Sequence, residues 1–389
     1  MYVGRELIGH MRYIISKFPA MSVMGPRQSG KSSLIKNEFS DFAYFNLEDI
    51  QLRELVASDI KGFLANNGQK IAIDEAQNLP ELFSYVQLAV DNDPDKRIIL
   101  SGSQSFLLHE KIAQSLAGRI GITRLLPFSV KELKAGRFET SDLAQLIFTG
   151  GYPRIYDQNI NPIHFYPNYI QTYVERDLRT LSNIGDLTLF DAFVRLCAGR
   201  VGQIINYSSM ANDLGVSLNT IKNWISILKT SFIAFELKPY YRNFSKRTVK
   251  SGKLYFYDTG LVCSLLGMTD KSQYQTHFLK GGLFENFVIV EVLKHFYNQV
   301  KEPKLYFWQD SNKNEVDCIV EVDGNTFSFE IKAGATWNKD FAKYLIKWND
   351  LTGFDAAKSA VVYGGSEEIV ISGVRFLPWF NFLKQFEIS

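Results

Sequence analysis

Residues 25–32 read Gly-Pro-Arg-Gln-Ser-Gly-Lys-Ser, which matches the phosphate-binding pattern Gly-x-x-x-x-Gly-Lys-Ser/Thr at every fixed position. The two glycines let the backbone curl so that N–H groups point inward at phosphate oxygens, and the following helix adds its positive end. Lys31 can reach the outer phosphates of a nucleotide, and the Ser32 hydroxyl can ligate Mg²⁺. We therefore expect a phosphate cradle formed by Gly25, Pro26, Arg27, Gln28, Ser29, Gly30, Lys31, Ser32 and Ser33.

Two acids, Asp74 and Glu75, follow an apolar run at 70–73. A strand that delivers two acids at its carboxyl end suits hydrolysis beside a phosphate-binding loop. We expect Asp74 to hold the Mg²⁺ shell and Glu75 to orient and polarise the attacking water. Without that loop upstream, such a pair would more often be a solvated turn.

Polar residues also follow the next apolar run, at 97–100. Ser103 or Gln104 could contact the terminal phosphate or the water there, and the alternative is a plain strand-to-helix turn.

Further on, Arg119 ends the stretch Ser-Leu-Ala-Gly-Arg. A lone arginine is usually a surface cation, but Arg119 is the best-placed candidate for an arginine finger that stabilises charge in the transition state.

A second group of acids lies in a predicted hairpin at 315–332, where Asp323-Gly324 separates two alternating runs. This turn places Asp317 opposite Glu330, Glu315 opposite Lys332 and Val320 opposite Phe327. One predicted face is wholly apolar, with Val316, Cys318, Val320, Val322, Phe327, Phe329 and Ile331. The other face carries Glu315, Asp317, Glu330 and Lys332.

Like charges directly opposite each other destabilise a sheet, and a divalent cation between Asp317 and Glu330 would turn that repulsion into binding. Lys332 could stabilise charge on a scissile phosphate. The pattern resembles that of PD-(D/E)xK nucleases, except that Val316 stands in place of the proline before the aspartate. Glu285 resembles the additional acid on the first helix of that fold. The resemblance implies a second Mg²⁺ or Mn²⁺ held by Glu285, Asp317 and Glu330. The alternative is a retained scaffold with a partly salt-bridged polar face.

The composition is that of a soluble globular protein: 389 residues, 46% hydrophobic and 22% charged, long enough for two or three domains. No apolar run approaches the roughly 20 residues that span a bilayer, and the first residues lack the apolar core of a signal peptide. Three widely spaced cysteines imply neither a disulfide framework nor a zinc site. We therefore expect a cytoplasmic protein without membrane contact. The net charge of +2 means that any basic surface must be local.

Short apolar runs alternate with helical stretches in the first third, which predicts a parallel sheet with crossover helices. The predicted strands lie at 19–23, 42–47, 70–73, 97–100 and 122–126. A helical stretch then continues to about residue 189. Its alternating charges suit a salt-bridged helix face, and the alternative is that Arg154 and Arg176 reach the nucleotide.

Residues 207–228 fit a helix-turn-helix, with a turn at Gly215 and a helix cap at Ser217. The second helix has a predicted buried face of Ile221, Trp224, Ile225 and Leu228 and an exposed face of Asn219, Thr220, Lys222 and Asn223. The stretch at 241–253 is basic, with aromatics and no acid, as suits a wing on the DNA backbone. The alternative is a helix pair that only packs domains together.

The phosphate loop, the acids after the third strand, Ser103 and Arg119 together resemble a group of prokaryotic AAA-type ATPases. The stretches Gly150-Gly-Tyr-Pro-Arg154 and Leu254-Tyr-Phe-Tyr-Asp-Thr-Gly-Leu261 are similar to its C-terminal half. The resemblance implies an α/β fold with strand order 5-1-4-3-2, a sensor at Ser103 or Gln104, and Arg119 acting on ATP within or between subunits. The expected regions are an ATPase core at 1–127, a helical lid at 128–190, a winged-helix region at 191–253 and an α+β nuclease-like domain at 254–389.

The sequence thus predicts a Mg²⁺-dependent ATPase coupled to a DNA-directed module, with nuclease activity as a candidate. The contrasting hypothesis is a non-catalytic switch in which ATP gates recognition of DNA or a protein partner. A homo-oligomer is compatible with both hypotheses. A small-molecule kinase is disfavoured because the large C-terminal half has no obvious place in one.

Overall fold

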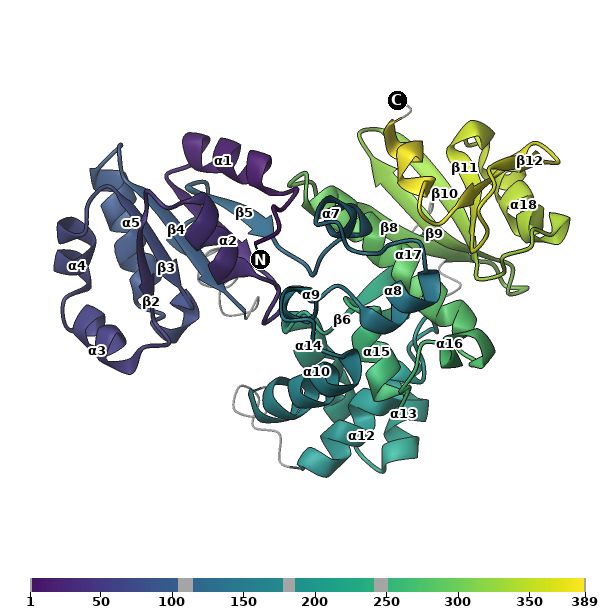
Figure 1. Ribbon diagram of the computed structural model, residues 1–389, viewed down its shortest axis with the longest axis horizontal. Coiled ribbons are helices and arrows are strands. Elements are labelled where there is room, and N and C mark those ends of the chain that lie inside the picture. The colour runs from purple at the N-terminus through teal and green to yellow at the C-terminus, as the bar shows by residue number, and fades with distance from the viewer. Residues whose placement is uncertain (1, 104–114, 178–185, 241–250, 388–389) are drawn as a thin grey trace.

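The computed structural model describes residues 2–103, 115–177, 186–240 and 251–387, without the side chains of 174–177. A five-stranded sheet lies at one end of the molecule and an eight-stranded sheet near the other, with helices between and below them (Figure 1). Within this described part, no helix has the length and apolar character needed to cross a bilayer.

The N-terminal sheet is parallel and has the order β2-β3-β4-β1-β5, which confirms the predicted order read from its other edge. The predicted strands are present, the last beginning two residues earlier than expected. Their bounds are β1 (Ala20–Met24), β2 (Ala43–Asn46), β3 (Lys70–Asp74), β4 (Arg97–Gly102) and β5 (Ile120–Arg124).

Helices cover both faces of this sheet, which explains why its strands read as continuous apolar runs rather than alternating ones. Buried residues of α1 (Ile8–Lys17) and α2 (Lys31–Glu38) pack on one face. Buried residues of α3 (Ile50–Ser58), α4 (Ile60–Asn66) and α5 (Leu82–Asn92) pack on the other. The carboxyl ends of β1, β3 and β4 therefore meet at one edge, where the sequence places its phosphate loop and acids.

The middle of the chain is helical, as predicted. It contains α7 (Val130–Ala135), α8 (Leu143–Thr149), α9 (Pro153–Asp157), α10 (Pro162–Tyr169), a π-helical segment (Ile170–Asp177), α12 (Leu187–Ala198), α13 (Tyr207–Leu214), α14 (Leu218–Thr230), α15 (Thr259–Leu265) and α16 (Gln273–Thr276). The predicted turn between α13 and α14 is confirmed, because Gly215 has a φ of +66° and Ser217 accepts a hydrogen bond from Thr220 N at 3.0 Å. The predicted buried face of α14 is buried.

The C-terminal sheet has the order β12-β13-β11-β10-β9-β8-β6-β7. Its strands are β6 (Ala234–Pro239), β7 (Lys253–Phe256), β8 (Lys304–Gln309), β9 (Glu315–Val322), β10 (Asn325–Lys332), β11 (Ser359–Tyr363), β12 (Ile369–Ile371) and β13 (Val374–Pro378). Residues of α17 (Lys280–Tyr297) and of β10 share one large cluster of buried residues, whereas α18 (Lys343–Thr352) belongs to another. The larger cluster runs without a break from the helical middle into this sheet.

The predicted hairpin register is confirmed where β9 and β10 pair, since Val320 lies opposite Phe327. Asp323 and Gly324 have φ values of +50° and +79°, as a two-residue turn with both φ angles positive requires. The prediction that Val316 shares a face of the hairpin with Cys318 was wrong. Val316 belongs to the same cluster of buried residues as Ile319 and Trp348, whereas Cys318 belongs to another cluster.

A β-bulge explains this exception. Tyr306 of β8 pairs with Ile319, but Trp308 pairs with Val316, so β9 carries one extra residue between these pairs. A bulge re-aims the side chains beyond it, and bulges are frequent next to active sites. Asp317 lies within this irregular stretch.

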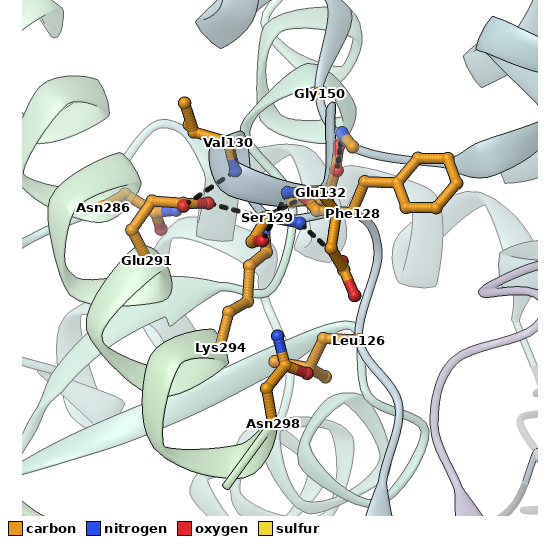
Figure 2. A network of polar contacts seen from close by, with 12 residues as sticks. Leu126, Phe128, Ser129, Val130, Glu132, Gly150, Asn286, Glu291, Lys294 and Asn298 are labelled. Atoms are coloured by element: carbon orange, nitrogen blue, oxygen red, sulfur yellow. Dashed lines mark hydrogen bonds and ion pairs between the residues drawn. The ribbon is translucent and has the colours of Figure 1, made fainter. Parts of the chain in front are cut away.

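Helix α17 attaches the C-terminal region to the segment that follows β5 (Figure 2). Glu291 accepts a hydrogen bond from Val130 N at 3.0 Å, and Lys294 donates to the carbonyl oxygen of Phe128 at 2.8 Å. The two side chains also pair with each other at 2.9 Å, and both are buried. The buried charges are thus neutralised by each other and by backbone groups, as a stable attachment requires.

Candidate functional site

The phosphate loop joins β1 to α2 and has the geometry that its glycines predict. Gly25 approaches the neighbouring backbone so closely that a Cβ atom would lie 2.1 Å from the carbonyl oxygen of Leu125. Gly30 has a φ of +96° and directly precedes the first residue of α2. Both positions therefore need glycine, and they bring the N-terminus of α2 to the loop.

Lys31 lies inside this loop and is 5% exposed. Its ammonium group donates to the carbonyl oxygens of Gly25 at 3.0 Å and Pro26 at 2.9 Å. Burial lowers the pKa of Lys31, against the opposing effect of the nearby Glu75 and Asp74 carboxylates. Phosphate oxygens would provide this buried cation with strong anionic partners.

Asp74 ends β3 and is bound by hydroxyl groups from neighbouring strands. It accepts hydrogen bonds from Tyr44 at 2.5 Å and from Ser101. Burial acts to raise the pKa of Asp74, but hydrogen bonds from Ser101, Ser32 and Tyr44 outweigh it and lower the pKa. Oxygen groups of this kind beside the phosphate loop suit a hard cation such as Mg²⁺.

Glu75 has a φ of +52°, an uncommon conformation for a residue with a side chain, and such conformations cluster at functional sites. Its carboxylate accepts hydrogen bonds from Gln77 and, at 3.3 Å, from Ser103. Ser103 follows β4 and is 2% exposed, so its hydroxyl is held beside Glu75. Gln77 was not predicted as a site residue, and Gln104 lies outside the described residues.

A cleft of about 520 Å³ opens beside the loop. Lys31, Ser32 and Glu75 line it together with three arginines from separate segments, Arg5, Arg27 and Arg154. Arg5 was not predicted, because nothing in the local sequence distinguishes it. It donates to the carbonyl oxygen of Ser29 at 2.9 Å and pairs with Glu132 at 2.9 Å.

Of the two arginines named as nucleotide contacts, Arg119 lies away from this cleft and Arg154 lies at it. Arg119 precedes β5 at the amino edge of the sheet and pairs with Asp91 at 2.6 Å. About six residues of strand, roughly 20 Å, separate it from the loop, so it does not reach the cleft of its own chain. Arg154 lies on α9 at the cleft and is exposed. The side chain of Arg176 lies outside the described part of the chain.

The predicted acidic residues also come together, at the ends of β9 and β10. Lys332 lies 2.5 Å from Glu330 and 3.4 Å from Asp317. Asp317 accepts a hydrogen bond from Ile331 N at 2.7 Å. Glu285 reaches the group from α17, and one carboxylate oxygen each of Glu285, Glu315 and Asp317 lie within 4.8 Å of one another.

Two members of this acidic site were missed by the sequence analysis, Lys253 and Tyr255 of β7. The ammonium group of Lys253 lies 2.9 Å from Glu285 and also bonds Glu315, and the Tyr255 hydroxyl donates to Glu285. The basic stretch at 241–253 predicts a wing on DNA, but Lys253 at its end is 3% exposed and points inward. Glu315, predicted to lie opposite Lys332 in the hairpin, pairs with Lys253.

Burial dominates the electrostatics of the acidic site. It raises the pKa of Glu285 to about 7, although Lys253 opposes this shift. Burial and the neighbouring Asp317 charge raise the pKa of Glu330 well above its usual value. Glu285 and Glu330 therefore take up protons more readily than exposed glutamates do, as expected where several acids share one buried space.

The third candidate surface is α14, where Asn219, Lys222 and Asn223 are exposed as predicted. Thr220 is partly buried, and its hydroxyl lies 2.8 Å from that of Ser217. The basic stretch at 241–250 lies outside the described residues. The described part of this surface thus offers one lysine and two amides.

Three family models match successive parts of the chain. Residues 17–134 match an AAA domain, residues 140–272 match a domain of unknown function (DUF8612), and residues 280–382 match another domain of unknown function (DUF4143). The first match covers the five-stranded sheet and its phosphate loop. The last begins with α17 and includes every acidic residue of the C-terminal site.

Similar proteins are known from bacteria and archaea. An uncharacterized protein of Mycobacterium tuberculosis is 27% identical over 374 residues, which cover 95% of this chain and 81% of that protein. An uncharacterized protein of Methanocaldococcus jannaschii is 26% identical, covering 92% of this chain and 87% of that protein. The solved structure of a Walker-type ATPase from Pyrococcus abyssi is 17% identical with a TM-score of 0.47, covering 67% of this chain and 94% of that one. Residues 17–134 thus resemble AAA domains in sequence, and they contain the parallel sheet and the phosphate loop.

Proposed function

We propose that the chain binds ATP with Mg²⁺ in the cleft beside Lys31, hydrolyses it, and uses the nucleotide state to control its C-terminal region. One observation carries the proposal: Lys31, Ser32 and Glu75 line one cleft at the phosphate loop, and Asp74 ends the adjoining strand β3. Ser32 and Asp74 would hold Mg²⁺, which neutralises phosphate charge when bound. Lys31 binds the outer phosphates, and the N-terminus of α2 adds backbone donors.

Glu75 orients the attacking water and accepts its proton. Gln77 and Ser103 both donate to the same oxygen of Glu75, Oε2. This arrangement fixes the carboxylate and leaves Oε1 to accept a hydrogen bond from water. Ser103 thereby links the position of the catalytic carboxylate to the end of β4.

Changing Glu75 to Gln tests this role, because the amide keeps the size of the side chain but cannot act as a base. We expect ATP binding to be retained and turnover to fall by about 10²–10⁴-fold. Binding of a fluorescent ATP analogue and release of phosphate measure the two steps. Glu81→Gln, at an exposed position on the same domain, is the matched control. Unchanged steady-state hydrolysis in Glu75→Gln would refute the assignment.

A second candidate function is phosphodiester cleavage of DNA at the C-terminal acidic site. It is favoured by the convergence of Glu285, Asp317, Glu330 and Lys332. A divalent cation fits this donor set, because Glu330 is 3% exposed and its Oε2 has no hydrogen-bond partner among the described residues. Glu285, Asp317 and Glu330 would hold the ion, which would polarise the phosphate and activate water. Lys332 would face the developing negative charge.

Plasmid DNA incubated with Mg²⁺ or Mn²⁺ distinguishes this function from a binding switch. Cutting by the native protein that is lost in Asp317→Ala supports a nuclease. Equal or absent cutting in both proteins leaves an inactive scaffold that recognises DNA or a protein.

Gel shifts with increasing salt test the DNA-binding surface. Lys222→Gln should weaken binding and reduce its salt dependence if α14 contacts phosphates. Lys246, Arg247 and Lys250, which lie outside the described residues, are the further candidates for neutralisation. A complete lack of shift in the native protein would favour a protein partner.

A further inference from the structure

Lys253 places a positive charge inside the acidic site. It is the first residue of β7 and is 3% exposed. Its ammonium group lies 2.9 Å from Oε1 of Glu285 and also donates to a carboxylate oxygen of Glu315. The ring of Phe307 lies 5.5 Å from the same ammonium group. The charged end of Lys253 is therefore enclosed by two acids and an aromatic ring.

This ammonium group occupies the space between carboxylates in which a metal ion would bind. Oxygens of Glu285, Glu315 and Asp317 lie within 4.8 Å of one another, which suits an ion that binds oxygen at about 2.0–2.6 Å. Lys253 already contacts two of these three carboxylates. A divalent ion placed between them would lie within a few ångströms of the ammonium group and would be strongly repelled.

Lys253 neutralises only part of the negative charge of the acidic site. Four carboxylates, those of Glu285, Glu315, Asp317 and Glu330, face two ammonium groups, those of Lys253 and Lys332. With all four carboxylates ionised, this leaves a formal charge of −2, an excess that a proton or a further cation can neutralise. In addition, Oε2 of Glu330 is buried without a hydrogen-bond partner among the described residues. A buried site with excess negative charge and an unused acceptor still favours a further cation.

We propose that Lys253 is an internal cation that competes with a divalent metal ion for the carboxylates of Glu285 and Glu315. With its ammonium group in place, the site is folded and partly neutralised without metal, and metal binds tightly only when that group moves away. The inference concerns the acidic site of the second proposed function, but it does not require that this site cut DNA.

The backbone around Lys253 connects this competition to the helical middle of the chain. Lys253 pairs with Leu237 of β6, and Leu254 exchanges hydrogen bonds with Gly202 and Gln203 at 2.8 and 3.0 Å. Residues 202–203 follow α12, which precedes the predicted helix-turn-helix. A shift of these helices would therefore be transmitted to the strand that carries Lys253.

Manganese binding by the full-length, nucleotide-free protein tests the proposal. The native protein, Lys253→Met and the control Lys229→Met are each titrated with Mn²⁺. Electron paramagnetic resonance measures the concentration of free Mn²⁺ at each step. Lys229 is an exposed lysine that pairs with Glu236 outside the acidic site. We expect Lys253→Met to bind one Mn²⁺ at least tenfold more tightly than the native protein, with Lys229→Met unchanged. Adding Asp317→Asn to Lys253→Met should abolish the gain.

A thermal unfolding series provides the second readout. Lys253→Met should unfold at a lower temperature than the native protein in EDTA and recover with Mn²⁺, whereas the native protein should respond little. Lys253→Gln, which keeps a hydrogen-bond donor without charge, replaces Lys253→Met if that variant does not fold. Native affinity for Mn²⁺ equal to that of the variant would overturn the proposal, as would a folded variant that binds none. Neither readout involves DNA cleavage, so loss of the nuclease hypothesis leaves the result interpretable.

Discussion

Arg5 and Glu132, 127 residues apart in the sequence, form a buried ion pair in which Nε lies 2.9 Å from Oε1. The same guanidinium donates to the carbonyl oxygens of Ser29 at 2.9 Å and Leu126 at 2.6 Å. Arg5 thus connects the phosphate loop, the segment after β5 and the N-terminus of α7. The adjoining segment is also the one that α17 holds through Phe128 and Val130.

Replacing Arg5 by Met should destabilise the protein by about 3–5 kcal/mol, because the buried Glu132 charge loses its partner. Urea unfolding measures this loss. Arg12→Met, which removes an exposed ion pair with Glu38, should change stability by less than about 1 kcal/mol. The double variant Arg5→Met with Glu132→Gln should recover part of the loss. Equal losses for Arg5→Met and Arg12→Met would contradict the importance of the buried pair.

The features that the sequence predicted correctly are those set by local pattern. Gly25 and Gly30 mark a loop whose shape depends on backbone conformation, and Asp323-Gly324 determines a turn and hence a register. Strand order was predicted through the resemblance, and the phosphate loop and acids then had to meet at one sheet edge.

The features that it missed depend on contacts between distant segments. The face of Val316 changes because of a bulge, which arises only when β8 pairs with β9. Lys253 lies in a basic stretch of sequence, and only the packing of β7 against α17 turns it into a buried partner of Glu285. Arg119 precedes β5 just as it precedes the strand predicted at 122–126, so its place at the amino edge was already implied by the sequence.

Gly25→Ala should impair the phosphate loop, because the added Cβ would lie 2.1 Å from the carbonyl oxygen of Leu125. We expect at least a tenfold loss of ATP affinity together with a lower unfolding temperature. Gly9→Ala, at a helical position with open space around its Cβ, is the matched control and should change neither quantity adversely. Native ATP affinity in Gly25→Ala would show that the loop tolerates the shift.

His295 should make stability depend on pH. Burial lowers the pKa of His295 below its usual 6.5, although Glu6 opposes the shift. Between the folded and unfolded pKa values the unfolded chain binds the proton more readily, so stability falls as pH decreases below about 6.5. Chemical denaturation at pH 5.5, 6.5 and 7.5 should therefore show a smaller pH dependence for His295→Gln than for the native protein. The same slope in both proteins would assign the effect to other groups.

Arg154 and Arg119 should affect ATP turnover in different ways. Arg154 lines the cleft of its own chain, and its guanidinium has no hydrogen-bond partner among the described residues, so it can contact a bound nucleotide directly. Arg154→Ala should therefore reduce turnover about tenfold or more at every protein concentration.

Arg119 lies at the opposite edge of the sheet and can reach a nucleotide only on another subunit. Arg119→Ala should reduce turnover only at concentrations at which the native protein is oligomeric. Mixing Arg119→Ala with Glu75→Gln would then restore activity if one subunit supplies the arginine and the other the water-orienting carboxylate. A loss for Arg119→Ala in a preparation that is monomeric by light scattering would contradict this assignment.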